Sequence, residues 1–587
     1  MLKCLFRVIT VFFLACYLSL GQAVAQDPTT SESVHSEQIW ERYRVERQIR
    51  QATSPIPGVT ITSPQPPVNI DEKSQQKVFK LNQILFDPNP TAIGISDIEA
   101  ITEKYVAMEM VSIYDLYSMI TEIDTLYDSK RILGRAVLPV QDIENGIVTI
   151  QIIEGRIEKT ILETKMPCIF DSETPTSTYR WFGNYFIRKQ FHFSGKGQFN
   201  LYQLENEILR YNRTFQSQLT AELEPGDELG STTLKLTRIL PKPISGGYYV
   251  DNSGRESSGK IRNGAYLSLA DIFGANESFF ASYDETEGSS ALYMSGELPV
   301  SSFGTFFDMS YYYGTPTTIN GAWASLNING VSEQYRPGIR QILVNTKNRR
   351  LDASLRYENY DSKTFFDTDL NFAEKHDSMT FGLENSYRMK KSAVFSGLFL
   401  VVGHSKTGTL APNLSLDYSP HDFSLLKMNL MKIWYPTDKV TFIVRGNGNA
   451  ALSWLPQSQV FQIGGQATVR GTPEALMSGD SGYLATLEGR YAVWNGSQSA
   501  RKFIKNSKIE LFTFLDHGGV VYREHSAPMR SADFLSSIGI GLMANLGNHI
   551  SLMGGFGQPI FTAESHLDVY KDELKHGNAF FSARATF

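Results

Sequence analysis

Cysteine is scarce in this chain of 587 residues. Its three cysteines are too few for a framework of disulfide bonds. Cys4 and Cys16 lie close to the start of the sequence, and we expect Cys168 to be a packed thiol rather than a reactive one. Lipidation of Cys16 is a minor alternative, because Phe13 stands where a lipobox has leucine.

An excess of positive charge is also missing. The formal net charge is −6 at pH 7, so nucleic acid is not expected as a partner. The ten histidines are scattered and form no H-E-x-x-H or other metal-ligand spacing, and no nucleophile motif or phosphate-binding loop is evident. We therefore expect no enzyme activity, no metal and no other cofactor.

Long apolar runs are lacking after the first 25 residues. Residues 1–25 begin with two basic residues, continue with an apolar stretch and end in Ala-Val-Ala, which predicts a secretory signal peptide cut before Gln26. No later run reaches the roughly 18 apolar residues that a membrane helix needs. The exported chain is therefore expected to be soluble or a β-barrel, whose strands escape hydropathy averages because half of their residues face a polar lumen.

A polar helix and a linker are predicted next. In Ser36–Gln51, apolar residues are interspersed with Arg and Glu, which is typical of a helix with charged pairs on its surface. Residues 52–74 are predicted to be an extended, semi-rigid linker, because five prolines fall between Ala52 and Val68. A solvated helix outside the core is the simplest interpretation unless another part of the chain gives it a place to lie.

Residues 75–155 are predicted to form a small α/β domain with the order β-α-α-β-β. Ser96 and Glu99 have the spacing of a capping box at the start of its first helix. A second helix is predicted at 113–130, and Asn145-Gly146 indicates the turn before the last strand.

Residues 156–240 repeat this order more loosely. Helices are expected at 179–190 and 201–213, and strands at 217–224 and 232–239. Repetition of one supersecondary unit indicates modular stacking. Two unrelated α+β domains are the alternative.

Residues 244–587 lack a helical pattern and alternate between apolar and polar side chains, as at Ala579–Phe587. This alternation predicts antiparallel strands of a transmembrane β-barrel, with one face toward lipid and the other toward a polar lumen. At about 20 residues per strand and connection, these 344 residues support roughly 16 strands. A soluble β-sandwich or propeller is the alternative, which the signal peptide and the terminal Phe587 disfavour.

A glycine-rich stretch, Phe461–Asp480, separates two of these strands and carries one isolated cation, Arg470. Loops of this length are usually functional or disordered. A guanidinium held unpaired in a narrow lumen costs several kcal/mol, so it needs a carboxylate. The planar guanidinium could form a bidentate pair with such a carboxylate. The alternative is that Arg470 is an ordinary solvated loop residue.

The α/β segments resemble polypeptide-transport-associated (POTRA) domains. Leu138–Asp142 leading to Ile152–Ile157 is similar to the end of the first such domain in two-partner secretion transporters. In that family, which exports haemolysins and filamentous adhesins, an N-terminal helix, a linker, two POTRA domains and a 16-stranded outer-membrane barrel follow one another. The resemblance covers the chain from about Ser36 to Phe587.

Two short motifs add to this resemblance. Thr468–Gly471 is similar to the V-R-G-aromatic motif of the family's long sixth extracellular loop, which folds back into the lumen, here at about 454–481. Phe514–Gly518 matches its F-x-D-x-G motif on a neighbouring strand. Thr472 stands where the family usually has Tyr or Phe.

The resemblance implies a contact between the loop and the barrel wall. Its candidate residues are Arg470 and Asp516 as a pair, Val469, Gly471 and Thr472 in the loop, and Phe514 and Gly518 on the wall. Glu488 and Arg490 share a strand face and are either generic lumen charges or gating residues.

The resemblance implies an outer-membrane transporter of a Gram-negative bacterium, with its POTRA domains in the periplasm. These domains would recognise one unfolded secreted partner protein, since exposed strand edges can accept an extended segment by β-augmentation. Outer-membrane lipid and the barrel-assembly machinery are the other expected partners, with Phe587 as the insertion signal. The 36–51 helix is expected to occupy the pore at rest and to leave it during transport.

Three other functions are weighed against this one. A barrel-assembly factor is disfavoured by the small number of POTRA units and by the N-terminal helix and proline linker. A passive porin or solute receptor would not need the periplasmic α/β repeats. A soluble binding module is disfavoured by the barrel pattern.

Overall fold

The computed structural model describes residues 78–143, 145–165, 187, 191, 201–228, 230–321, 323–410, 416–496, 507–521, 532–562 and 571–587. The predicted signal peptide, the 36–51 helix and the 52–74 linker lie outside the described residues, as does the expected 179–190 helix except for Ile187. The chain divides into two compact units, which are described one at a time.

The elements of the first α/β domain follow the predicted β-α-α-β-β order, with two additional strands of two residues each that pair with one another. The elements are β1 (Val78–Phe79), β2 (Gln83–Phe86), α3 (Ile95–Val106), β3 (Val111–Ser112), α4 (Ile113–Ser129), β4 (Gly134–Val137) and β5 (Ile147–Glu154). A sheet of order β2-β5-β4 pairs β2 parallel to β5, and β4 antiparallel to β5. The apolar face of α4 is buried in the domain core through Leu116, Met119 and Ile123, as its helical spacing indicates.

The predicted capping box at Ser96 is wrong. Helix α3 has Gly94 as its N-cap and no side-chain cap, so Ser96 already lies inside the first turn. The capping box forms instead at α4, where Asp115 N donates to Ser112 Oγ at 3.2 Å and Ser112 N donates to Asp115 Oδ2 at 2.8 Å. Asp115, rather than Glu or Gln, closes this box, which is why the S-x-x-E pattern did not identify it.

Glu154, at the end of β5, holds this domain together by accepting hydrogen bonds. Its carboxylate accepts from Thr91 N at 3.0 Å, Ala92 N at 2.8 Å and the Tyr127 hydroxyl at 2.9 Å. Partial burial acts to raise the pKa of Glu154, but these hydrogen bonds outweigh it and hold the pKa below its ordinary value.

We expect Glu154→Gln to lower the free energy of local unfolding of this domain by about 2 kcal/mol at neutral pH, because a charged acceptor of several bonds is lost. A carboxyl whose pKa is lowered by folding stabilises above its unfolded pKa and ceases to do so as the pH falls through the folded value. The difference should therefore shrink in acid. Protease cleavage of the purified full-length protein across pH measures it, with the exposed Glu103→Gln as the control. Equal cleavage of both variants at pH 7 would contradict this role.

The second α/β segment contains β6 (Arg156–Lys165), α6 (Leu201–Thr214), β7 (Gln218–Pro225) and β8 (Ser231–Ile239). Its sheet has the order β6-β8-β7, with β6 parallel to β8 and β7 antiparallel to it. This is the same arrangement of one parallel and one antiparallel neighbour around a central strand as in the first domain. Leu204 and Ile208 of α6 are fully buried.

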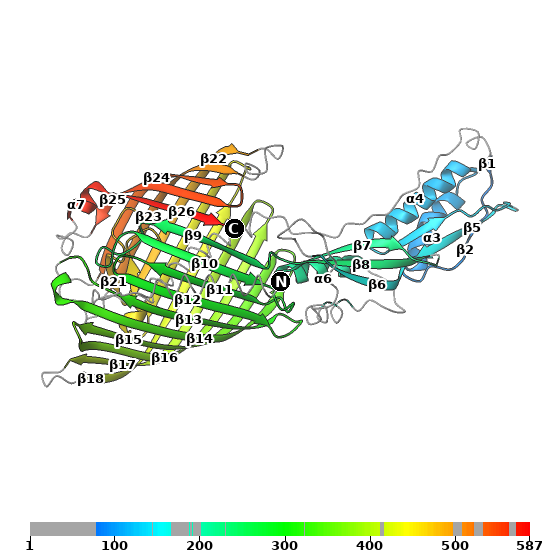
Figure 1. The fold of residues 1–587 in the computed structure, drawn as a ribbon. Coiled ribbons are helices and arrows are strands. Elements are labelled where there is room, and N and C mark those ends of the chain that lie inside the picture. Colours follow the sequence, from blue (N-terminus) through cyan, green and yellow to red (C-terminus); the bar gives the residue numbers. More distant parts are fainter. Residues whose placement is uncertain are drawn as a thin grey trace. The chain divides into compact units, whose positions relative to one another are not determined.

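The second unit is a closed, antiparallel barrel of 16 strands, which confirms the predicted architecture (Figure 1). The strands are β9 (Ile244–Asp251), β10 (Arg262–Ala270), β11 (Ser278–Glu285), β12 (Ser289–Pro299), β13 (Thr305–Pro316), β14 (Ile328–Asn345), β15 (Arg349–Phe366), β16 (Asp369–Met389), β17 (Ser392–Leu410), β18 (Leu416–Trp434), β19 (Val440–Ala451), β22 (Ser481–Asn495), β23 (Lys508–Val521), β24 (Ala532–Leu546), β25 (Ile550–Thr562) and β26 (Asn578–Thr586). Each strand pairs with the next, and β26 pairs with β9 to close the barrel. Phe587 N donates to Gly246 O at 2.9 Å at this junction.

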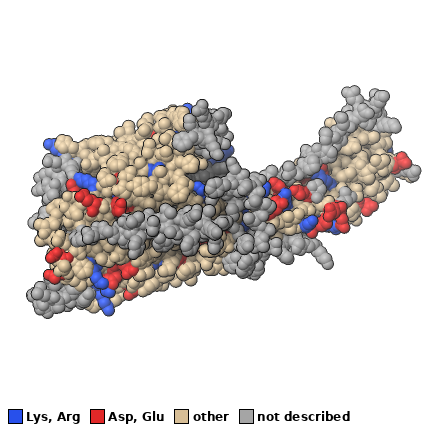
Figure 2. Space-filling model, viewed as in Figure 1, with Lys and Arg blue, Asp and Glu red and all other residues tan. Residues whose placement is uncertain are grey.

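The barrel is apolar outside and polar inside. Along β16, Phe381 and Leu383 are about half exposed, whereas Glu374, His376 and Ser378 are buried. On the face of the barrel drawn in Figure 2, wide areas carry neither basic nor acidic side chains. Such a surface is suited to lipid.

Helices in the described ranges are all too short or too polar to cross a membrane.

Candidate functional site

The connection between β19 and β22, residues 452–480, folds against the inner wall of the barrel. It contains a 3₁₀ turn, η3 (Gln457–Gln459), and a small hairpin of β20 (Phe461–Ile463) and β21 (Met477–Gly479). Its apolar side chains form a buried cluster with residues of three wall strands and of the short helix α7 (Lys571–His576). The cluster comprises Ile463, Val469, Met477, Leu484, Val520, Leu535 and Leu574. Burial of these side chains gives the loop a defined position, which a solvated loop would lack.

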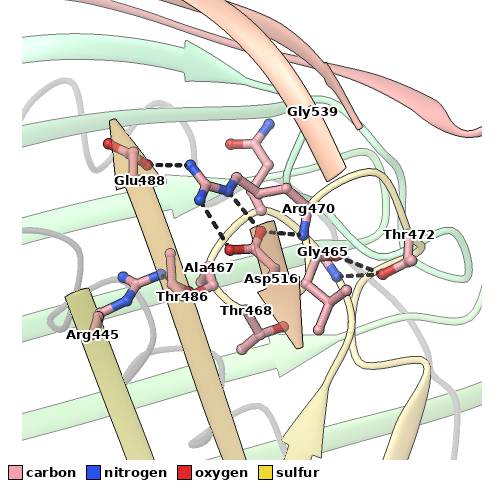
Figure 3. Close-up of polar contacts among 12 residues, drawn as sticks. Arg445, Gly465, Ala467, Thr468, Arg470, Thr472, Thr486, Glu488, Asp516 and Gly539 are labelled. Atoms are coloured by element: carbon pink, nitrogen blue, oxygen red, sulfur yellow. Dashed lines mark hydrogen bonds and ion pairs between the residues drawn. The ribbon is translucent and has the colours of Figure 1, made fainter. Parts of the chain in front are cut away.

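Arg470, near the tip of this loop, faces Asp516 on β23 (Figure 3). Arg470 Nε donates to Asp516 Oδ2 at 2.8 Å, and Nη2 donates to Oδ1 at 3.0 Å. The backbone N–H of Arg470 also donates to Oδ2 at 3.1 Å. Asp516 is fully buried and Arg470 is 8% exposed. One carboxylate therefore holds both the side chain and the backbone of the loop residue, in the bidentate geometry of a strong charge-assisted pair.

Glu488 on β22 is a second partner of Arg470. The Arg470 Nη1 group donates to Glu488 Oε2, and Arg490 Nε donates to Glu488 Oε1 at 2.7 Å. Two arginines and two carboxylates thus form one network in which every charge has an opposite neighbour. Because each ion has lost most of its water, this compensation is what makes the burial tolerable. The spacing of Glu488 and Arg490 on one strand face indicated lumen charges but not this contact with the loop.

The aromatic ring of Phe514 also contacts the guanidinium of Arg470. The central carbon of the guanidinium, Arg470 Cζ, lies 3.7 Å from the centroid of the Phe514 ring, a cation–π contact. Phe514 is buried together with Phe512 and Phe580, which fixes the plane of its ring. The alternation of β23 places Phe514 and Asp516 on the same face, so both reach the same arginine.

Thr472 closes the turn around Arg470. Its hydroxyl donates to Val469 O at 2.7 Å and accepts from Gly465 N at 3.2 Å. Thr468 closes the other side of the turn in the same way, donating to Gly464 O at 2.7 Å. Where the family usually has an aromatic side chain, this chain has a hydroxyl that forms hydrogen bonds with backbone groups inside the loop.

Glycines let the loop and the wall approach closely. Gly471 has φ +85°, and a Cβ there would lie 2.2 Å from Gly557 O on β25. A Cβ on Gly518 would lie 3.2 Å from Ile463 Cγ2 and 3.4 Å from Val469 Cγ2. Two of the predicted motif glycines thus lie where loop and wall meet, whereas Gly557 had no motif to identify it.

The arrangement is suited to holding a loop rather than to a reaction. The arginines and carboxylates saturate one another, which leaves no free base or nucleophile among them. Within the described ranges, no three His, Cys, Asp or Glu side chains are grouped so that they could hold a metal ion.

Comparisons with known proteins agree with this architecture. The family model for the haemolysin secretion/activation protein ShlB/FhaC/HecB matches residues 230–544, and the model for the ShlB-type POTRA domain matches residues 79–155. The chain is 22% identical over 503 residues to the outer membrane transporter CdiB of Dickeya dadantii, covering 83% of this chain and 85% of the relative. It is 23% identical over 515 residues to the heme/hemopexin transporter protein HuxB of Haemophilus influenzae, covering 85% and 86%.

A solved structure of CdiB from Escherichia coli has a similar fold. It superimposes with a TM-score of 0.61 at 17% identity, covering 96% of this chain and 100% of that one.

Proposed function

Because the chain belongs to the family of haemolysin secretion/activation proteins, we propose that it carries one unfolded secreted protein through its barrel to the cell surface. The observation that carries the proposal is the family match across residues 230–544, which runs from β8 of the second α/β segment into β24 of the closed 16-stranded barrel and includes the loop fastened inside it. The barrel lies in the outer membrane and the POTRA region lies in the periplasm. The proposed activity is transport, with no catalytic step.

Client recognition is assigned to the POTRA region. The β2-β5-β4 sheet has β2 and β4 at its edges, and the β6-β8-β7 sheet has β6 and β7 at its edges. An extended segment of an unfolded client could pair with such an edge, because backbone hydrogen bonds give affinity with little demand on sequence. Folding of the client outside the cell would then favour its onward movement.

Arg470, Asp516 and the residues around them are assigned to positioning the inward loop for transport. The wall carboxylate grips the loop by three hydrogen bonds, and Glu488, Phe514 and Gly518 fit around the same contact. Breaking and remaking this contact is a discrete change that could accompany passage of the client.

Deletion of the gene for this chain tests the function. One large exported protein should disappear from the culture medium, and expression of the chain from a plasmid should restore it. The other outer-membrane proteins should keep their normal abundance. A general loss of outer-membrane barrels would instead indicate a barrel-assembly factor. An unchanged medium combined with a defect in solute uptake would indicate a porin or receptor.

A further inference from the structure

The inward loop is also held at its beginning, far from Arg470. Ser458 and Gln459 of η3 are each 6% exposed and face a polar cluster on β15 and β16. Ser458 Oγ donates to Glu374 Oε1 and lies 3.2 Å from His376 Nδ1. Gln459 Nε2 donates to Glu358 Oε1 at 3.0 Å. Two consecutive loop residues thus direct polar atoms at three buried side chains of the wall.

The wall side of this contact is itself fixed in place. His376 Nε2 lies 2.9 Å from Glu358 Oε1, and the His376 ring stacks on Tyr360 at a centroid distance of 5.0 Å. Arg336 on β14 donates to Glu358 Oε2 at 2.8 Å, so this carboxylate is gripped from both sides. Phe423 of β18 packs edge-on against the same histidine ring. These contacts between wall residues hold Glu358 and His376 without any contribution from the loop, which lowers the entropy cost of binding it.

Apolar packing next to this cluster holds the same part of the loop. Leu455, three residues before Ser458, is 3% exposed and lies in a buried cluster with Val401, Phe423 and Leu425. Phe423 belongs to both groups of contacts, since it touches His376 as well as this cluster. The first part of the loop therefore has its own polar and apolar attachment to the wall.

We propose that Glu358, Glu374 and His376 form a second anchor that positions the inward loop for transport. This inference rests on the proposed function, in which the loop must be held for secretion. The Arg470 site lies on β22 and β23, whereas this anchor lies on β15 and β16, and the closed barrel places β17, β18 and β19 between the two sites. A loop attached at one point of the wall could pivot about it, whereas attachment at two separate points fixes its direction across the lumen. The three wall side chains are positioning residues and the loop is what they position.

Accessibility of the loop measures this anchor directly. Leu455→Cys in a Cys168→Ser background gives a single thiol once the predicted signal peptide, with Cys4 and Cys16, has been removed. This thiol is buried while the loop is anchored. The full-length protein is purified in detergent, and its rate of labelling by a maleimide is measured. Glu374→Leu, which cannot accept the Ser458 bond, should increase the rate about tenfold, because a buried donor is left without its partner. Glu374→Gln keeps an acceptor oxygen and should stay within about twofold of the parent.

Ser458→Ala removes the donor from the loop side without altering the wall. It should increase labelling as Glu374→Leu does, and the double variant should be little worse than either single one. Asp422→Leu is the matched control, because it removes a carboxylate from an exposed pair with His404 on β17 and β18. Heat-modifiable gel mobility verifies that every variant contains a folded barrel.

Secretion of the client should fall in Glu374→Leu and Ser458→Ala and stay near normal in Glu374→Gln. Labelling that is unchanged in Glu374→Leu and Ser458→Ala would overturn the anchor. Faster labelling with normal secretion would overturn its role in transport. Failure of the proposed function is recognised separately: deletion of the whole chain would then leave the exported proteins unchanged, whereas the labelling rates are measured without a client.

Discussion

Arg470→Ala is expected to reduce secretion of the client at least about tenfold while the barrel still inserts in the membrane. The variant leaves Asp516 buried without its cation and removes one of the two arginines that neutralise Glu488. Because breaking a buried pair costs about 3–5 kcal/mol, the loop should leave its position on the wall. Asp516→Ala removes the other side of the same contact and should lose a similar amount of secretion. Client in the medium is measured against the amount of barrel in the membrane.

The pair also predicts how the substitutions combine. The Arg470→Ala, Asp516→Ala double variant should be little worse than either single one, because one contact is broken in each case. Arg470→Lys should rescue poorly, since an ammonium cannot reproduce the bidentate contact with Asp516 or the stacking on Phe514. Arg349→Ala, on an exposed part of β15, is the control. Two small and additive losses would show that the loop is held by other contacts.

The barrel could be predicted from the sequence because its physical cause is local. Each strand must present an apolar side to lipid and a polar side to the lumen, and a period of two residues records that requirement strand by strand. Helix α4 was likewise predicted, since its buried residues recur with helical spacing. The start of α3 was not, because Gly94 begins that helix through its backbone and leaves no side-chain signal.

The candidate site was predictable only in part. A lone cation in a loop requires an anion. The resemblance of Phe514–Gly518 to the family's motif implied that this anion is Asp516, and in the structure Arg470 Nε donates to Asp516. The contribution of Glu488 depends on strand register, in which Glu488 lies opposite Phe514 and Thr486 opposite Asp516. The apolar–polar alternation of β22 turns Glu488 toward the lumen, but it leaves pairing shifts of two residues between β22 and β23 open, so the sequence alone does not bring Glu488 to Arg470.

The second anchor has no local signal at all. Ser458 and Glu374 are 84 positions apart, and their contact exists only because the loop crosses from β19 to the wall at β16. Serine and glutamine are ordinary loop residues, so neither indicates a partner. Gly557 likewise has no signal in the sequence, because its lack of a side chain matters only where the loop backbone lies against it.

Gly557→Ala is expected to reduce secretion about tenfold, although the substitution adds one methyl group and removes no charge. The new Cβ would lie 2.6 Å from Arg470 O and 2.8 Å from Gly471 Cα. These are backbone atoms, which cannot rotate away as a flexible side chain can, so the loop tip must move off the wall. Displacement of the Arg470 backbone would strain its hydrogen bonds to Asp516 in turn. The amount of client in the medium, normalised to folded barrel, measures the effect.

Gly554→Ala on the same strand is the matched control, because its nearest neighbour would be Phe580 O at 3.9 Å. Gly554→Ala changes strand propensity as much as Gly557→Ala does, and secretion of the client should stay normal in it. Gly471→Ala should behave like Gly557→Ala, since it introduces the same clash from the loop side and also places alanine at φ +85°. The two substitutions together should lose little more than either alone, because the first already separates the two backbones. Equal secretion by Gly554→Ala and Gly557→Ala would show that the loop tip does not need to lie against β25 during transport.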